Sequence, residues 1–167
     1  ADGEELPAFK GHIYADANGL FPVQLNEWER EVVATEIGRP SFVAWYRNPQ
    51  RATPNSLRIA YQDESGKWSS LQSDFVIVSK RDDGSLAASI VDPHGDHLAD
   101  AKAKLRALAD FAEQYGDRFL RIESIAKGPD GTLRSLDLQD ASVRKAVRGF
   151  EGGKISPLYS SSGVAYK

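Results

Sequence analysis

Two aspartates, Asp74 and Asp92, stand at the ends of neighbouring apolar segments. Asp74 directly precedes the segment 75–78, and Asp92 directly follows the segment 86–91. Between these segments lies Asp82-Asp83-Gly84, and an Asp-Gly pair is typical of a tight hairpin turn. An antiparallel hairpin would bring the two acids together at one edge of a sheet, where their carboxylates could share a hard cation such as Mg²⁺. The pattern therefore predicts a divalent-metal site at this edge.

His94 lies two residues beyond Asp92 and, in an extended chain, within reach of the same point. An imidazole there could orient or deprotonate an attacking water and stabilise charge on a phosphate. Ordinary interpretations remain open, because Asp92 could only shape the turn at Pro93 and His94 could be a helix-capping or surface histidine. Asp74 could be a simple strand-entry acid. However, an unpaired charge before an apolar strand is unfavourable, which favours the metal role.

The helices that would flank these residues follow from capping signals and hydrophobic spacing. A first helix is predicted from Asn26 to Ile37, with Glu29 placed to complete a capping box with Asn26. A second is predicted from an N-cap at Asp96 to Gly116. Its apolar stripe consists of Leu98, Ala101, Leu105, Leu108, Ala109 and Ala112.

Strands are expected where β-branched and aromatic residues cluster or alternate. The expected strands cover residues 41–46, 57–62, 73–78, 86–91, 118–126 and 133–138, and a last helix covers 140–148. A hairpin-rich set of strands that feeds a crossover helix and a further strand implies an α/β fold. We expect a mixed sheet of about five strands flanked by helices.

These motifs resemble the PD-(D/E)xK nuclease superfamily. Ser73-Asp74 stands for its Pro-Asp pair, Asp92-Pro93-His94 for its acid-x-Lys triplet, and Glu29 for the glutamate of its preceding helix. The expected element order, helix–strand–strand–strand–helix–strand, matches the superfamily core. The resemblance implies a restriction-endonuclease-like fold that hydrolyses DNA phosphodiesters. It further implies Mg²⁺, or Mn²⁺, bound by Asp74, Asp92 and Glu29, with Asp92 and His94 as catalytic groups.

The stretch 26–124 is similar in more detail to the nuclease-like C-terminal region of DEAD/DEAH-box helicases related to type III restriction subunits. The segments that carry this likeness are Trp45-Tyr46-Arg47-Asn48-Pro49, Ser73-Asp74-Phe75, Val91-Asp92-Pro93-His94-Gly95 and residues 100–105. The likeness implies two partners: DNA, and a helicase or ATPase domain in the same longer protein.

Two positions depart from the superfamily pattern, with Ser73 in place of proline and His94 in place of lysine. The following helix could supply the lysine, and we expect Lys104, or failing that Lys102, to serve as the catalytic cation. If neither reaches the site, the domain would be a degenerate nuclease that only binds DNA. A third hypothesis is an unrelated small-molecule enzyme, with Asp92 and His94 as an acid/base pair in a deep pocket.

Other residues have two interpretations each. Arg47 and Arg51, in or beside a loop after an aromatic strand, could bind DNA phosphate or could be solvated arginines. Glu29 could serve the capping box alone. Three tryptophans are expected in the core rather than as base-stacking platforms: Trp28, Trp45 and Trp68.

Composition limits the protein class. The chain has 167 residues, 41% hydrophobic and 27% charged, which suits one globular domain. No apolar run is long enough for a membrane span, and no basic-then-apolar leader opens the chain. The absence of cysteine excludes disulfides and thiolate zinc sites and permits the cytoplasmic location that we expect. The net charge of −3 argues against tight DNA binding by a free-standing module.

We expect the chain to be a piece of a longer protein, because it lacks an initial methionine and opens like an interdomain linker. The predicted organisation is a linker at 1–24, a nuclease-like domain at 25–148 and a C-terminal tail at 149–167. Leu158 and Tyr159 are expected to anchor the tail.

Overall fold

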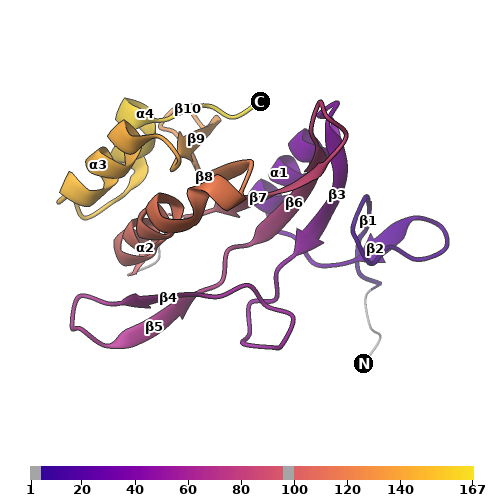
Figure 1. Ribbon diagram of the computed structural model, residues 1–167, viewed down its shortest axis with the longest axis horizontal. Coiled ribbons are helices and arrows are strands. Elements are labelled where there is room, and N and C mark those ends of the chain that lie inside the picture. Colours follow the sequence, from indigo (N-terminus) through magenta and orange to yellow (C-terminus); the bar gives the residue numbers. More distant parts are fainter. Residues whose placement is uncertain (1–4, 96–99) are drawn as a thin grey trace.

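The protein, seen in a computed structural model that describes residues 5–95 and 100–167, is built around one mixed β-sheet (Figure 1). Six strands lie side by side in the order β10-β9-β8-β7-β6-β3. Their bounds are β3 (Phe42–Arg47), β6 (Phe75–Lys80), β7 (Leu86–Pro93), β8 (Arg121–Lys127), β9 (Leu133–Asp137) and β10 (Val164–Ala165). All neighbours are antiparallel except β7 and β8, which are parallel. The predicted α/β class with a mixed sheet is confirmed.

Helices cover both faces of this sheet. The helical elements are α1 (Glu27–Ile37), α2 (Ala101–Tyr115), the short 3-10 turn η1 (Gly116–Arg118), α3 (Ala141–Gly149) and α4 (Ser156–Ser162). Successive residues of a strand point to opposite faces of the sheet. Val91 therefore packs in the same core cluster as residues of α1, and Ile90 packs in the other cluster, with residues of α2, α3 and α4. The parallel step from β7 to β8 requires the α2 crossover, as expected for a parallel pair.

Capping residues and apolar spacing in the sequence predicted both long helices. Asn26 accepts from the backbone N–H of Glu29 while the Glu29 carboxylate accepts from the N–H of Asn26, so the predicted capping box is confirmed. The described part of the second helix begins at Ala101, with Asp100 before it. Its apolar stripe is buried at Leu105, Leu108, Ala109 and Ala112. The proposed cap Asp96 and the stripe residue Leu98 lie outside the described residues.

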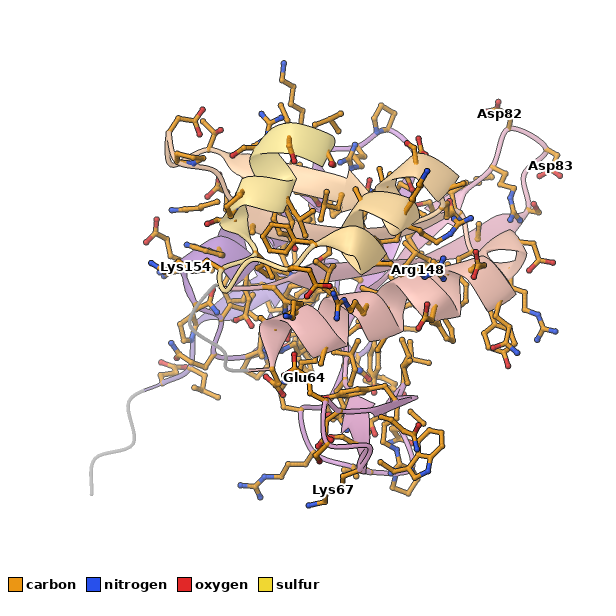
Figure 2. All side chains as sticks on the ribbon, turned by 90° about the vertical axis from the view of Figure 1, so that its left-hand side faces the viewer. Glu64, Lys67, Asp82, Asp83, Arg148 and Lys154 are labelled. Carbon is orange, nitrogen blue, oxygen red and sulfur yellow. The ribbon has the colours of Figure 1, made fainter. Side chains whose placement is uncertain are left out.

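One predicted strand belongs to a different sheet. Residues 57–62 contain β4 (Ile59–Gln62), but β4 pairs with β5 (Trp68–Leu71) in a separate two-stranded hairpin. Figure 2 shows Lys67 at the end of this projecting hairpin. Trp68 is 68% exposed, so its expected burial is wrong, whereas Trp45 is fully buried as predicted. Trp68 and the buried Leu71 are three residues apart on β5, so their side chains point to opposite faces of the hairpin.

Both ends of the described chain pack on this core. β1 (Ala8–Lys10) and β2 (Leu20–Pro22) form a hairpin whose Phe9 and Phe21 pack against Trp45. Near the C-terminus, Leu158 and Tyr159 of α4 are buried, as the anchor hypothesis predicted. Among the described residues, no helix has both the length and the apolar character needed to cross a bilayer.

Candidate active site

The β6–β7 hairpin brings Asp74 and Asp92 into contact. Phe75 lies opposite Val91 in the antiparallel register, so the acids that flank this pair meet at the same end of the hairpin. The backbone N–H of Asp74 donates to Asp92 Oδ1 at 2.8 Å. Asp82 lies in the turn that joins the strands (Figure 2), next to the Lys80–Leu86 pair at the opposite end of the hairpin. The local Asp-Gly turn thus sets the position of two residues that are 18 apart in the chain.

Arg47 lies between two of the predicted metal ligands. Its Nη2 donates to Glu29 Oε1 at 2.7 Å and its Nη1 donates to Asp74 Oδ1 at 3.0 Å. Gln50 Nε2 donates to the same Asp74 oxygen at 2.7 Å. The guanidinium also lies 5.1 Å above the ring of Phe75. Glu29 therefore caps α1 with one oxygen and binds Arg47 with the other, so both of its roles coexist.

The position of Arg47 has a signal in the sequence that its DNA-binding interpretation did not use. Trp45 is buried and faces α1, and side chains two apart on a strand share a face. Arg47 must then point toward the same helix, where Glu29 stands three residues after the helix cap. Strand alternation combined with the capping box could have suggested this pair.

His94 adjoins Asp92 at the end of β7. Its backbone N–H donates to Ile125 O at 2.7 Å, and its Nε2 lies 2.9 Å from Asp92 Oδ2. Burial, the largest single influence, would lower the pKa of His94, but the charge of Asp92, its polar contact with the imidazole and the charge of Asp74 together outweigh burial and raise this pKa. Lys104 opposes the rise, which places its charge within range of the imidazole. The electrostatics favour a cationic His94.

Asp74 has a perturbed acidity. Burial and, after it, the charge of Asp92 raise its pKa to about 7, with a smaller contribution from Glu29. Arg47 lowers this pKa, but not enough to restore the usual value. Three carboxylates crowd one guanidinium and one imidazole, so the cluster is short of positive charge.

Asn48 locks the loop that carries Gln50 onto the site, a role that the sequence reasoning missed. Its fully buried amide donates to Leu57 O and Ser73 O, and its oxygen accepts from the Leu57 N–H. Its backbone N–H donates to Asp74 O at 2.9 Å. A polar residue directly after a buried strand and before a proline was the available signal.

The remaining predicted residues lie further out. Lys104 Nζ is 3.0 Å from Asp100 Oδ2, and Lys102 Nζ is 3.6 Å from Glu64 Oε1 on the β4–β5 hairpin. Arg51 is exposed in the loop after β3. The structure thus gathers Glu29, Arg47, Asp74, Asp92 and His94, keeps Lys104 near them, and leaves Lys102 and Arg51 outside.

The acidic residues that the structure describes do not form a closed protein cage for a metal ion. No three His, Asp or Glu side chains within residues 5–95 and 100–167 are arranged to hold a metal ion by themselves. Asp92 Oδ2 and His94 Nε2 are buried and lie 2.9 Å apart. Mg²⁺ commonly takes one or two carboxylates and completes its shell with water and substrate phosphate. Asp74 and Asp92 supply such a pair.

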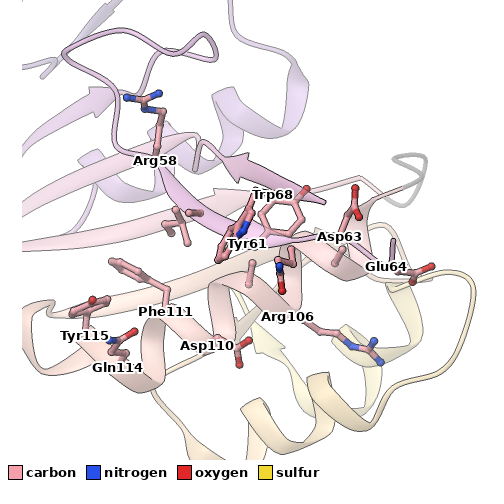
Figure 3. Close-up of a pocket in the computed structure, with 15 residues that line it drawn as sticks. Arg58, Tyr61, Asp63, Glu64, Trp68, Arg106, Asp110, Phe111, Gln114 and Tyr115 are labelled. Atoms are coloured by element: carbon pink, nitrogen blue, oxygen red, sulfur yellow. The ribbon is translucent and has the colours of Figure 1, made fainter. Parts of the chain in front are cut away.

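A separate groove of about 830 Å³ lies between the β4–β5 hairpin and α2 (Figure 3). Tyr61, Trp68 and Phe111 contribute aromatic surface to it. Neither Asp92 nor His94 lines this groove. It therefore lends no support to a small-molecule enzyme that uses those two residues as an acid/base pair.

Comparison with known proteins identifies the family. The chain matches the model of the YagJ family over residues 10–167. It is 41% identical over 157 residues to Protein YagJ of Escherichia coli (strain K12), a match that covers 94% of this chain. The chain spans 63% of the length of that relative. No solved structure matches the chain significantly. This protein therefore belongs to the YagJ family.

Proposed function

We propose that the edge formed by Asp74 and Asp92 is a Mg²⁺-dependent phosphodiesterase site that cleaves DNA, with Mn²⁺ as an alternative cation. The observation that carries this proposal is the meeting of Asp74 with the fully buried Asp92 at one end of the β6–β7 hairpin, with Glu29 held beside them through Arg47. A carboxylate pair with one fully buried member and one partly buried member is a favourable place for a divalent cation.

The strand order supports the finer assignment of a restriction-endonuclease-like core. Helix α1 is followed by three antiparallel strands, the crossover helix α2 and a strand parallel to β7. The resemblance to PD-(D/E)xK nucleases implies this same order. It also implies that the acids stand at the ends of the second and third core strands, which here are β6 and β7.

The proposed roles follow from the contacts. When bound, Mg²⁺ would activate a water and offset negative charge on the phosphate. Asp74 and Asp92 would hold it, and Glu29 would stand beside them through Arg47. A cationic His94 would take the place of the missing lysine, because the charge of Asp92 favours its protonated form. Lys104 would add charge from the start of α2.

A plasmid-nicking assay across Mg²⁺ and salt concentration tests the proposal. We expect slow nicking at low salt that chelation abolishes and that salt suppresses steeply, because a chain of net charge −3 makes few phosphate contacts. Asp74→Asn and Asp92→Asn should each remove the activity while keeping side-chain shape. Asp82→Asn, in the distant turn, is the matched control. Nicking that survives chelation or both site variants would refute the assignment.

A binding-only domain is the second candidate, and the placement of Arg47 favours it. A permanent cation already bridges Glu29 and Asp74, and histidine replaces the lysine. In that case a labelled duplex would bind equally well with chelator and with Mg²⁺, and Asp74→Asn would not weaken binding. On the same resemblance we propose a helicase or ATPase domain of a longer protein as partner.

A further inference from the structure

The guanidinium of Arg47 bridges the carboxylates of Glu29 and Asp74 at the edge of the proposed metal site. Its two terminal nitrogens divide between these carboxylates, at 2.7 and 3.0 Å. The side chain is only 17% exposed and rests over Phe75. The backbone N–H of Arg47 donates to His12 Nε2 at 3.1 Å, so the strand end is held by a contact that does not involve the guanidinium.

The hydrogen bonds already made by the carboxylate oxygens show where a cation and Arg47 would compete. Asp74 Oδ1 already accepts from Arg47 and Gln50, and Glu29 Oε1 accepts from Arg47. Glu29 Oε2 is used by the helix cap, and Asp92 Oδ1 by the Asp74 N–H. A cation bound at Asp74 would share its ligand with a guanidinium of like charge a few ångströms away. Arg47 and the cation therefore oppose each other at this site.

We propose that Arg47 is an internal counter-ion that competes with the divalent cation for Asp74, and that substrate phosphate relieves this competition by binding the displaced guanidinium. Metal and nucleic acid would then strengthen each other's binding, because each removes the obstacle to the other. Arginine suits this exchange, since its planar fork fits carboxylate and phosphate alike. The inference rests on the proposed function, because it requires a metal at Asp74.

Mn²⁺ affinity, measured by electron paramagnetic resonance of free Mn²⁺, tests the proposal without any activity assay. At about pH 8, Arg47→Ala should tighten Mn²⁺ binding by about tenfold or more, because it removes one repelling charge from a poorly solvated site. Arg51→Ala controls for net charge, because Arg51 is exposed in the following loop. Gln50→Ala controls for loss of a neutral donor to the same oxygen. Both controls should change the affinity far less.

A phosphorothioate duplex, which resists cleavage, provides the second arm. It should tighten Mn²⁺ binding to the wild-type protein and do so less in Arg47→Ala. Circular dichroism establishes that each variant is folded. Equal Mn²⁺ affinities in wild type and Arg47→Ala, with binding lost in Asp74→Asn, would overturn this inference and leave the metal site standing. Absence of binding in folded wild type and folded Arg47→Ala alike would overturn the metal site as well.

Discussion

Two buried ion clusters flank helix α1, and they differ in how their charge is balanced. At its C-terminal end, Arg121 donates to both oxygens of Glu36 at 2.7 and 3.1 Å and to Glu123 at 2.8 Å. Arg39 and the Tyr166 hydroxyl also contact Glu36. Burial alone would raise the pKa of Glu36, but the hydrogen bonds and charge of Arg121 outweigh it and hold this pKa below the usual value.

At the other end of α1 the carboxylates outnumber the cations, although burial raises the pKa of Glu123 in the first cluster too. Glu29, Asp74 and Asp92 share Arg47 and His94, and the pKa of Asp74 is raised to about 7. Both clusters contain buried carboxylates and an arginine, so residue types alone do not distinguish them. The difference teaches that a self-sufficient network holds a fold together, whereas an under-compensated one suits an external cation.

The largest expected effect comes from breaking the balanced cluster. Arg121→Met leaves the fully buried Glu36 without its bidentate partner, and loss of one partner of a buried pair lowers the free energy of unfolding by about 3–5 kcal/mol. Urea unfolding monitored by tryptophan fluorescence measures it. If the free energy of unfolding falls no more than on removal of a surface arginine, Arg39 alone would be enough to balance the charge of Glu36.

A smaller effect concerns pH. The folded-state pKa of Asp74, about 7, lies above its unfolded value, so the unfolded chain ionises first as pH rises. Asp74 should therefore make the free energy of unfolding fall between about pH 4 and pH 7, by roughly 1–3 kcal/mol. Urea unfolding in chelator across this range, compared between wild type and Asp74→Asn, isolates the contribution. Parallel pH profiles for the two proteins would contradict it.

A bound metal ion should supply the positive charge that the Asp74 cluster lacks and thereby stabilise the folded chain. At ten times its dissociation constant, Mg²⁺ should raise the free energy of unfolding by about 1.4 kcal/mol, because it binds the folded chain alone. Asp74→Asn should lose this gain in a thermal-shift titration, whereas Arg121→Met, acting at the other end of α1, should keep it. A gain that persists in Asp74→Asn would locate the cation elsewhere.

The smallest effect is expected from a third, exposed ion cluster. Arg148 binds Asp110 and Glu113 on the surface of α2, with all three side chains well solvated. Exposed pairs contribute little because water screens them. Arg148→Ala should leave the urea midpoint within error of wild type at moderate salt. A shift of the urea midpoint as large as that of Arg121→Met would show that burial does not determine how much each ion cluster contributes to stability.

Local patterns predicted the parts of the site that local contacts build. The Asn26–Glu29 box, the Asp-Gly turn and the pairing of Asp74 with Asp92 each depend on a few neighbouring residues or one hairpin. The arginine bridge was not predicted, since Arg47 meets Asp74 across 27 residues of sequence. Alternation tells which face a side chain occupies, but not which distant residue lies beside it.

The same limit applies to the fold. Residues 57–62 have strand character, yet nothing local decides whether a strand joins the main sheet or pairs in a separate hairpin. The exposure of Trp68 follows from that choice. The Gly/Ser-rich C-terminal segment forms α4 and β10 because Tyr159 and Leu158 bury themselves against the core, which composition does not reveal.

Because β7 pairs with β8 in parallel, the contacts of the site should form at different stages of folding. The Asp74 N–H is held within a hairpin, whereas the His94 N–H binds Ile125 O across the whole α2 crossover. Hairpins close in about microseconds, and distant contacts form later because a longer loop must be ordered first. Pulsed amide exchange during refolding should thus protect the Asp74 amide before that of His94. The acid pair would assemble first, and the imidazole would reach it only once α2 has docked.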